Sequence, residues 1–450
     1  MSDLAPRSAG DWRSPAIKQP ITAHRYTSPD YMAQEWERVW TKTWLIAALE
    51  RDVAEPGEHV VFNFGRESIL VSCDDDGGIG AFYNVCQHRG TRLVADDRGQ
   101  TKNFVCPYHG WTYDNAGTLT VVPTRKRFAG GVDCGERSLK PVRCETWAGL
   151  VWVCMDDDAP PLAEYLGPLV DLIEPYRIHD MTLITDQTVS LDCNWKAVYD
   201  NFGELYHVEH IHPQHALTFD CPRAELGLYR HGHTGVFIEG FTVNTKRGVP
   251  DDPTPPMATQ MRLYGLNPDD YRGRVLEVRK AIQQARREAG PALGYNYDLL
   301  TDEQLSDINQ FNFFPNAMAT IQPDDMIIMR ARPHPTDPNR CWWDKFTLMM
   351  QPQSGDDAVR QHDGFGRPVR PEEHIGTDGR PRRDEFTHDQ VLRGEKTMTI
   401  TIDQDIRLIR DVQAGMHSQG FDNALLSDEE ERITHHHHWL DHYMSPPSEK

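Results

Sequence analysis

The chain has 450 residues, of which 38% are apolar and 9% aromatic, a globular composition long enough for two or three domains. Asp and Glu outnumber Lys and Arg by 68 to 47, and the resulting formal net charge of −21 disfavours a role on nucleic acid or on an anionic membrane surface. No stretch reaches the roughly 20 apolar residues of a membrane-spanning helix, and residues 1–14 contain no apolar signal-peptide core, so we expect a cytoplasmic protein.

The predicted elements divide the chain into three segments. Residues 1–43 are a polar leader followed by a helical pattern over Pro29–Trp44. Residues 44–157 alternate short β-rich pieces with turn clusters, which is typical of a small all-β domain. Residues 158–450 mix both patterns and predict a larger α+β domain.

The third segment contains two predicted helices, two predicted strands and one long loop. In chain order these are a helix over Tyr271–Ala289, strands over Thr320–Arg332 and Trp342–Gln351, a loop over Pro352–Arg383 and a helix over Thr401–Met416. No nucleotide-binding loop of the GxxxxGK[ST] or GxGxxG type accompanies them, so nothing in the sequence supports nucleotide binding.

Two short loops in the predicted β domain each pair one cysteine with one histidine. The first is Cys86-Gln87-His88-Arg89-Gly90 and the second is Cys106-Pro107-Tyr108-His109-Gly110-Trp111. A zinc site is one interpretation, but zinc knuckles usually pair like ligands, whereas each loop here is mixed. Mixed loops favour a [2Fe–2S] cluster in which Cys86 and Cys106 hold one iron and His88 and His109 hold the other.

A second dense segment, Asn194–Pro213, carries Glu204, His207 and His212. At helical spacing Glu204 and His207 share a face, while His207 and His212 converge only if the helix loosens between them. Two histidines and one carboxylate on one face of an iron are the ligand set of non-haem Fe(II) oxygenases. The best distant carboxylate is Asp405, early in the last predicted helix, with Asp403 as a rival.

Together these motifs resemble the large (α) subunit of Rieske non-haem iron oxygenases, the ring-hydroxylating family. The similar features are CxHRG and CPYHGW, NWK followed by YHxxxxH, and a VQxG turn after Asp405. The resemblance implies a small all-β Rieske [2Fe–2S] domain at 44–157. It is placed ahead of a catalytic mononuclear iron domain at 158–450, an antiparallel sheet flanked by helices. Residues 1–43 are expected to form a helical segment that packs on the catalytic domain.

The resemblance also implies roles for single residues. His207, His212 and Asp405 are the expected ligands of a mononuclear Fe(II). Glu204 falls where the family has an acidic residue that links His109 of one subunit to an iron ligand of the next, which implies a homotrimer. Asn201 lies on the same predicted helix, where its side chain either faces the iron or serves as a cap or a packing residue.

The function implied is the oxygenase component of a multicomponent system for aromatic hydrocarbon catabolism. It inserts O2-derived oxygen into an aromatic or other apolar substrate, as a dioxygenase or monooxygenase. The resemblance implies electrons from NAD(P)H through a separate reductase, with or without a ferredoxin, and an α subunit that works with or without a small β subunit. Glu in place of the more common Asp at 204 is similar to quaternary-ammonium oxygenases and several demethylases, so demethylation of a methoxyarene or oxidation of a quaternary amine is the alternative.

Two other classes stay open on the residues alone: a Rieske electron carrier without oxygenase activity, and a zinc-binding structural protein. Further histidines lie outside the two motifs. His210 and His215 are candidates for lining the pocket. The run His435–His438 is expected to be a solvated helical stretch.

Overall fold

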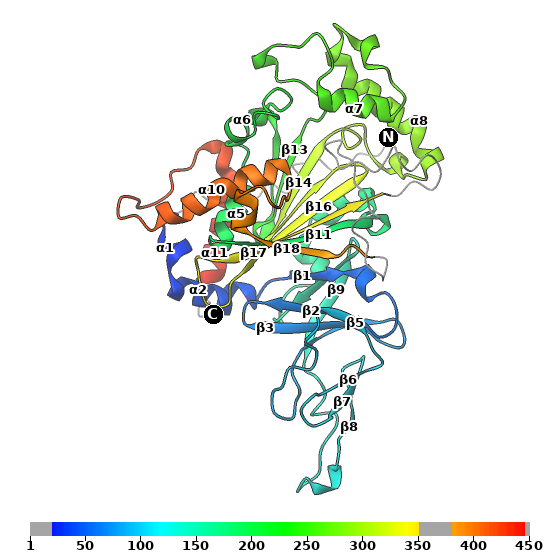
Figure 1. Cartoon of the computed structure of the whole chain (residues 1–450), viewed down its shortest axis with the longest axis vertical. Coiled ribbons are helices and arrows are strands. Elements are labelled where there is room, and N and C mark those ends of the chain that lie inside the picture. Colours follow the sequence, from blue (N-terminus) through cyan, green and yellow to red (C-terminus); the bar gives the residue numbers. More distant parts are fainter. Residues whose placement is uncertain (1–19, 351–379, 446–450) are drawn as a thin grey trace. The chain divides into compact units, whose positions relative to one another are not determined.

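The computed structural model describes residues 20–350 and 380–445. These residues fold into two compact units, one formed by Ala33–Tyr165 and the other by the described residues on either side of it (Figure 1). The fold class is therefore the expected one, a small all-β part followed by a larger α+β part. In the described residues, no helix is both long and apolar enough to cross a membrane.

The smaller unit is built from two antiparallel sheets. Its seven-stranded sheet has the order β1-β10-β9-β4-β3-β2-β5, and its three-stranded sheet the order β6-β7-β8. The strands are β1 Leu45–Leu49, β2 Glu58–Phe64, β3 Glu67–Cys73, β4 Ile79–Tyr83, β5 Arg98–Gln100, β6 Asn103–Val105, β7 Thr112–Asp114, β8 Leu119–Val121, β9 Pro141–Trp147 and β10 Leu150–Cys154. Both cysteine–histidine loops therefore belong to this unit.

The larger unit is organised around one eight-stranded sheet of order β12-β13-β14-β15-β16-β17-β11-β18, antiparallel except for the parallel β11–β18 pair. Its strands are β11 Thr182–Leu191, β12 Glu225–Leu228, β13 Thr234–Ile238, β14 Ile308–Phe313, β15 Ala317–Ile321, β16 Asp325–Pro333, β17 Cys341–Met349 and β18 Arg383–Thr387. Nearly every residue of β16 and β17 is buried, as expected for central strands covered on both faces.

The helices of the larger unit are α1 His24–Thr27, α4 Leu169–Ile173, α5 Trp195–Asn201, α6 Val208–Ile211, α7 Pro255–Leu263, α8 Val278–Leu293, α9 His388–Leu392, α10 Ile400–Met416 and α11 Glu431–Met444. Two further helices, α2 Pro29–Glu35 and α3 Leu162–Leu166, cross the boundaries between the units. α10 matches the predicted last helix. The side chain of Thr399 caps it by accepting from Ile402 N, and Ile402, Ile406 and Ile409 are buried at helical spacing.

Two sequence-based predictions for the larger unit differ from the structure, and a third falls mostly outside the described residues. The helix expected from Tyr271 begins only at Val278, because Gly273 adopts a left-handed φ of 71° that ends the preceding turn. The strand expected over Thr320–Arg332 is two strands, β15 and β16, joined by a turn. The predicted loop over Pro352–Arg383 lies mostly outside the described residues.

Candidate metal centres

The two cysteine–histidine loops have the same backbone geometry. In each, the glycine donates its N–H to the cysteine carbonyl four residues earlier: Gly90 to Cys86 and Gly110 to Cys106, both at 3.0 Å. Both glycines adopt positive φ, 77° and 69°, which a residue with a Cβ adopts only with strain. Local turn chemistry therefore shapes each loop, and the β6–β7 pairing supports the second.

The four predicted cluster ligands come together at this pair of loops. His88 Nδ1 lies 3.2 Å from His109 Nδ1, close to the separation of about 3.0–3.4 Å expected for two nitrogens bound to one metal ion. Burial raises the pKa of the Cys86 thiol. For His88 the pKa is lowered, mainly by burial and further by the neighbouring His109 and Arg89. A neutral imidazole is ready to bind a metal, and a buried thiolate needs a positive partner, so this donor set fits a cluster of the Rieske type.

Aromatic side chains pack against both a histidine and a cysteine of this site. Trp111 is buried and stacks on the His88 ring, with 4.9 Å between ring centroids and 8° between planes. Tyr113 is buried, and its hydroxyl accepts from Gln87 N at 3.0 Å and lies 3.4 Å from Cys86 Sγ. Tyr113 could not be singled out from the sequence, because only the β7 register directs it toward the thiol.

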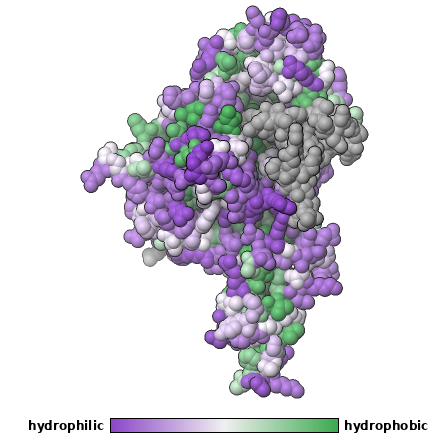
Figure 2. Space-filling view, in the orientation of Figure 1, coloured by the Kyte–Doolittle hydropathy of each residue, from purple (hydrophilic) through white to green (hydrophobic). Residues whose placement is uncertain are grey.

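The rim of the loops is exposed and partly apolar. Figure 2 shows apolar atoms on the surface over β6–β8, where Val105 and Val121 are exposed. Tyr108 is exposed as well, and the Arg89 guanidinium lies 5.1 Å from its ring centre.

The region around the two loops also differs from the rest of the chain in charge. Residues 84–140 carry nine Lys and Arg against five Asp and Glu, so this region is net positive in a chain of net charge −21.

The second candidate centre begins where helix α5 ends. The Asn194 side chain caps α5 by accepting from Lys196 N at 3.0 Å. The helix expected between Asn194 and Pro213 is interrupted: α5 stops at Asn201, a turn follows, and α6 covers only Val208–Ile211. His207 and His212 flank this short helix, and the backbone leaves the helical conformation at His212 (φ −114°, ψ 70°), so the two rings face one another.

His207, His212 and Asp405 converge on one point. His212 Nε2 lies 3.2 Å from His207 Nε2 and 3.1 Å from Asp405 Oδ1, and the third edge, from His207 Nε2 to Asp405 Oδ1, is 3.6 Å. Ligand atoms about 2.1 Å from one ion and at right angles lie about 3.0 Å apart, so the triangle has the size of a metal site.

The burial of these groups also fits a cation. Asp405 and His212 are 1% and 2% exposed, and Asp405 Oδ1 receives no hydrogen bond of good geometry from any described residue. Burial lowers the pKa of His212, but the Asp405 carboxylate outweighs it and raises that pKa overall. A buried carboxylate oxygen without a donor needs a positive partner, and a proton on His212 or a metal ion supplies it.

Both ligand-type histidines are held from behind through Nδ1. Glu204 Oε1 contacts His207 Nδ1, and Glu204 Oε2 accepts from His207 N at 3.1 Å. Gln404 Oε1 lies 2.8 Å from His212 Nδ1. Such contacts fix the tautomer that presents Nε2 to the metal. The sequence did not single out Gln404, although its place next to Asp405 was a usable signal.

Asp403 does not join this triangle. Its carboxylate accepts from Met398 N at 2.9 Å and from the Thr397 hydroxyl, so it is engaged at the start of α10. Asn201 is the last residue of α5, and its Nδ2 is buried without a hydrogen-bond partner in the described chain. The amide nitrogen of Asn201 therefore caps no carbonyl at the end of α5 in the described chain.

The two extra histidines of the second motif differ from each other. His210 is exposed. His215 Nε2 lies 3.0 Å from Thr401 Oγ1, and the His215 ring stacks on Phe219. Burial is the main cause that lowers the pKa of His215 to about 4, and the neighbouring His212 lowers it further. A neutral His215 therefore packs beside the triangle, where it contributes shape and not charge.

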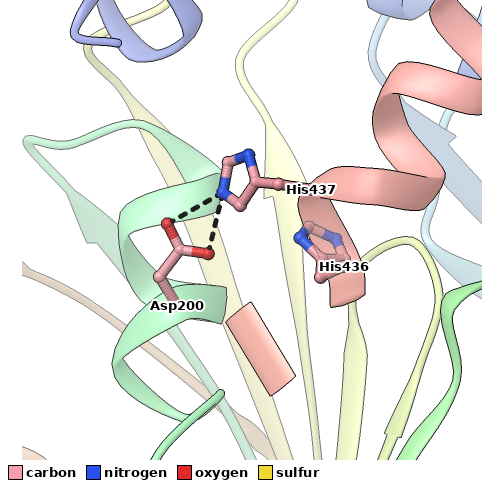
Figure 3. A group of neighbouring side chains, drawn as sticks. All are labelled: Asp200, His436 and His437. Atoms are coloured by element: carbon pink, nitrogen blue, oxygen red, sulfur yellow. Dashed lines mark hydrogen bonds and ion pairs between the residues drawn. The ribbon is translucent and has the colours of Figure 1, made fainter. Parts of the chain in front are cut away.

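The solvated stretch expected at His435–His438 is wrong for its first three residues. His435, His436 and His437 are 0% exposed, because they lie on the face of α11 that packs inward. His437 Nε2 lies 3.2 Å and 3.3 Å from the two Asp200 oxygens (Figure 3). His436 Nε2 donates to the Pro315 carbonyl at 3.0 Å. A run of histidines reads as polar in sequence, and only long-range packing reveals that it is interior.

Asp200, His436 and His437 each offer one possible metal-ligand atom, and these three atoms lie within 4.8 Å of one another, which is near enough to bind one metal ion. The Arg25 guanidinium, which can only donate, lies 3.5 Å from His437 Nδ1, so Nε2 carries the proton that faces Asp200. The Tyr26 hydroxyl also donates to Asp200. These hydrogen bonds occupy His437 and Asp200 without a metal, so the group is a buried anchor for the end of α5.

Comparisons with known proteins match both units. The family model for the ring hydroxylating α subunit (catalytic domain) matches residues 178–446, and the model for the Rieske [2Fe-2S] domain matches residues 43–142. The glycine betaine monooxygenase oxygenase subunit of Pseudomonas aeruginosa (strain UCBPP-PA14) is 31% identical over 180 residues, 40% of this chain and 42% of that protein. The large oxygenase component of the naphthalene 1,2-dioxygenase system of Pseudomonas putida is 37% identical over 184 residues, 40% and 41% of the two chains.

The chain thus spans less than half the length of these curated relatives. The alignments with solved structures cover a far larger share of the chain. The quaternary ammonium Rieske monooxygenase CntA in complex with L-carnitine aligns over 95% of this chain and 96% of its own, with a TM-score of 0.64 and 18% identity. Naphthalene 1,2-dioxygenase from Rhodococcus sp. bound to indole aligns over 95% of both chains, with a TM-score of 0.64 and 20% identity. At these identities the likeness establishes the fold alone.

Proposed function

The chain belongs to the family of Rieske non-haem iron ring-hydroxylating oxygenase α subunits, and from that premise we propose that it is the catalytic component of a multicomponent oxygenase. It inserts O2-derived oxygen into an organic substrate with electrons that reach it from NAD(P)H through a separate reductase. The observation that carries the proposal is the triangle of His207, His212 and Asp405 in a chain that also has a complete Cys2His2 cluster set.

In this proposal Cys86, His88, Cys106 and His109 hold the [2Fe–2S] cluster, and His207, His212 and Asp405 hold Fe(II). When bound, the cluster supplies single electrons and the iron activates O2 at positions that the three protein ligands leave open. The protein residues keep the iron ligands in place: Glu204 orients His207, and the burial of His212 and Asp405 keeps water from competing with them.

In a pure electron carrier the 2-His-1-carboxylate site would have no function. A structural zinc protein would not need a Cys2His2 site and a 2-His-1-carboxylate site together. Both alternatives are therefore secondary. Iron content separates the three: about three irons per chain fit the oxygenase, about two fit the carrier, and stoichiometric zinc fits the zinc protein.

Electron delivery involves two kinds of partner. The net positive region 84–140 around the cluster loops favours an electron donor with an acidic surface.

The second partner is another copy of the chain. Glu204 is the residue that links His207 to His109 of the partner subunit, and this transfer of electrons between subunits requires a homotrimer. A molar mass in solution of about three times 51.5 kDa is expected for the α subunit alone.

The proposed substrate is aromatic or otherwise apolar, and the relatives include oxygenases named for naphthalene and 2,4-dinitrotoluene. The second candidate is demethylation or oxidation of a methoxyarene or quaternary amine. It is supported by Glu at position 204 and by relatives named for glycine betaine and carnitine.

Product analysis under 18O2 with a surrogate reductase tests the proposal. The panel contains arenes, aryl acids, methoxyarenes and trimethylamines. Two labelled oxygens in a cis-diol indicate ring dihydroxylation, and one labelled oxygen or loss of formaldehyde indicates the second candidate. A protein that binds both metals fully but consumes no O2 with any of these compounds would contradict an oxygenase function.

A further inference from the structure

Gln404 lies at the centre of a small amide network behind His212. Its Oε1 is 2.8 Å from His212 Nδ1 and also accepts from Gln214 Nε2 at 2.8 Å. In return, Gln404 Nε2 donates to Gln214 Oε1 at 3.4 Å. Two glutamine amides paired in this way fix their orientation relative to each other, since reversing one of them alone would place donor against donor.

This orientation determines where the proton of His212 lies. A carbonyl oxygen only accepts, so His212 Nδ1 must carry the hydrogen that faces Gln404 Oε1. The other ring nitrogen, Nε2, points to His207 Nε2 at 3.2 Å and to Asp405 Oδ1 at 3.1 Å. The ring therefore already directs Nε2 toward the place where a cation would bind, and no ring flip is needed.

The two histidines of the triangle differ in the group that holds them. His207 is backed by a carboxylate, Glu204, and His212 by a neutral amide, Gln404. A carboxylate partner makes its imidazole more electron-rich, whereas an amide fixes the ring with little added charge. Because Gln404 directly precedes the ligand Asp405 in α10, one helix turn carries both a ligand and the orienting group of another ligand.

We infer that Gln404 is a positioning residue of the mononuclear iron site, which holds His212 in the Nδ1–H tautomer so that Nε2 faces the metal. The inference rests on the proposed function only in taking His207, His212 and Asp405 as iron ligands. It assigns to Gln404 a contribution to metal affinity that is separate from any contact with substrate.

Metal affinity of the apoprotein is the direct test. Fe(II) or Co(II) is titrated into protein that keeps its cluster, with a competing chelator, for the wild type and for Gln404→Leu, Gln404→Glu and Gln284→Leu. Gln404→Leu is expected to weaken binding about 10–100-fold. Gln404→Glu retains the acceptor and is expected to restore affinity to within a few-fold. Gln284, an exposed glutamine of α8, is the matched control and is expected to change nothing.

The Co(II) absorption bands give a second reading, because a misoriented His212 changes the coordination geometry and a distant packing defect does not. Circular dichroism and the cluster absorbance verify that each variant is folded. Equal affinities for Gln404→Leu and wild type, or no rescue by Gln404→Glu, would overturn the inference. If His207→Ala and wild type bind the metal equally, the proposed ligand set itself fails, and that result is distinct from a failure at Gln404.

Discussion

The four proposed cluster ligands lie within one short stretch, Cys86–His109, whereas His212 and Asp405 of the proposed iron triangle are 193 positions apart in the sequence. The loops that carry the cluster ligands are shaped by their own turns, and their histidines are half-exposed. The triangle is assembled from the two ends of α6 and from α10, and two of its three members are almost fully buried. A locally encoded site depends on few contacts, while the triangle depends on the packing of the whole larger unit. The two centres should therefore fail separately.

The largest effect is expected from Asp405→Ala. It removes the buried carboxylate of the triangle, so mononuclear iron and oxygenase turnover should fall below detection while the cluster spectrum stays unchanged. Iron analysis should decrease from about three to about two per chain. Asp403→Ala is the neighbouring control, with iron content expected at the wild-type level. Loss of the cluster together with the mononuclear iron would contradict the independence of the two centres.

Cys86→Ser is the reciprocal change. Serine is a poor ligand for iron in a Rieske cluster, so the visible absorbance of the cluster and coupled turnover should disappear. The mononuclear site should still bind about one Fe(II) or Co(II) per chain, measured by titration. Cys144→Ser serves as the control, since Cys144 lies on β9 away from both cluster loops in the sequence. Failure of the iron site in Cys86→Ser would show that the two centres are not independent.

Glu204→Gln tests the link between the centres. Glutamine still accepts from His207 Nδ1 but has no charge, so both metals should be retained while coupled turnover falls about 10–100-fold. Single-turnover kinetics of the reduced enzyme give the measurement. Glu209→Gln is the matched control, because Glu209 is a surface partner of Arg247. Unchanged single-turnover rates in Glu204→Gln would show that the carboxylate has no such role.

Acid should destabilise the larger unit through its buried histidines. Burial lowers the pKa of His435 from 6.5 to about 4, so the unfolded chain binds a proton that the folded chain does not. Its contribution is complete above about pH 6.5 and lost as pH falls toward 4, a change of about 3 kcal/mol. Urea unfolding as a function of pH measures this slope. His435→Gln, whose Nε2 can replace the imidazole donor to the Tyr229 carbonyl, should show a shallower slope; an equal slope would contradict the assignment.

The smallest effect is expected from Asp200→Asn in the buried anchor of α5. The carboxylate takes hydrogen bonds from His437 and Tyr26, and its neutralisation should lower the free energy of unfolding of the larger unit by about 1–3 kcal/mol. Asp192→Asn, which breaks an ion pair with Arg410 at a half-exposed surface site, should cost less than about 1 kcal/mol. If both variants lower the free energy of unfolding equally, the buried hydrogen bonds of Asp200 contribute no more to stability than a surface ion pair.

Features that depend on short-range chemistry could be predicted from the amino-acid order alone. These include the ligand types and spacing of the cluster loops, their glycines, the periodicity of α10 and the candidacy of His207, His212 and Asp405. Each of these follows from residues a few positions apart, because turns and helices are formed by neighbouring residues. The α+β class followed from the same local patterns.

Which groups meet and which are interior could not be predicted in this way. The helix is interrupted after Asn201, Asp403 is engaged by its near neighbours at a helix start, Gln404 lies behind His212, and His435–His437 are buried. The last two outcomes depend on contacts between segments 121 to 237 positions apart, and burial is a property of the packed unit and not of a residue. For that reason a histidine run that looks solvent-exposed in the sequence lies in the core.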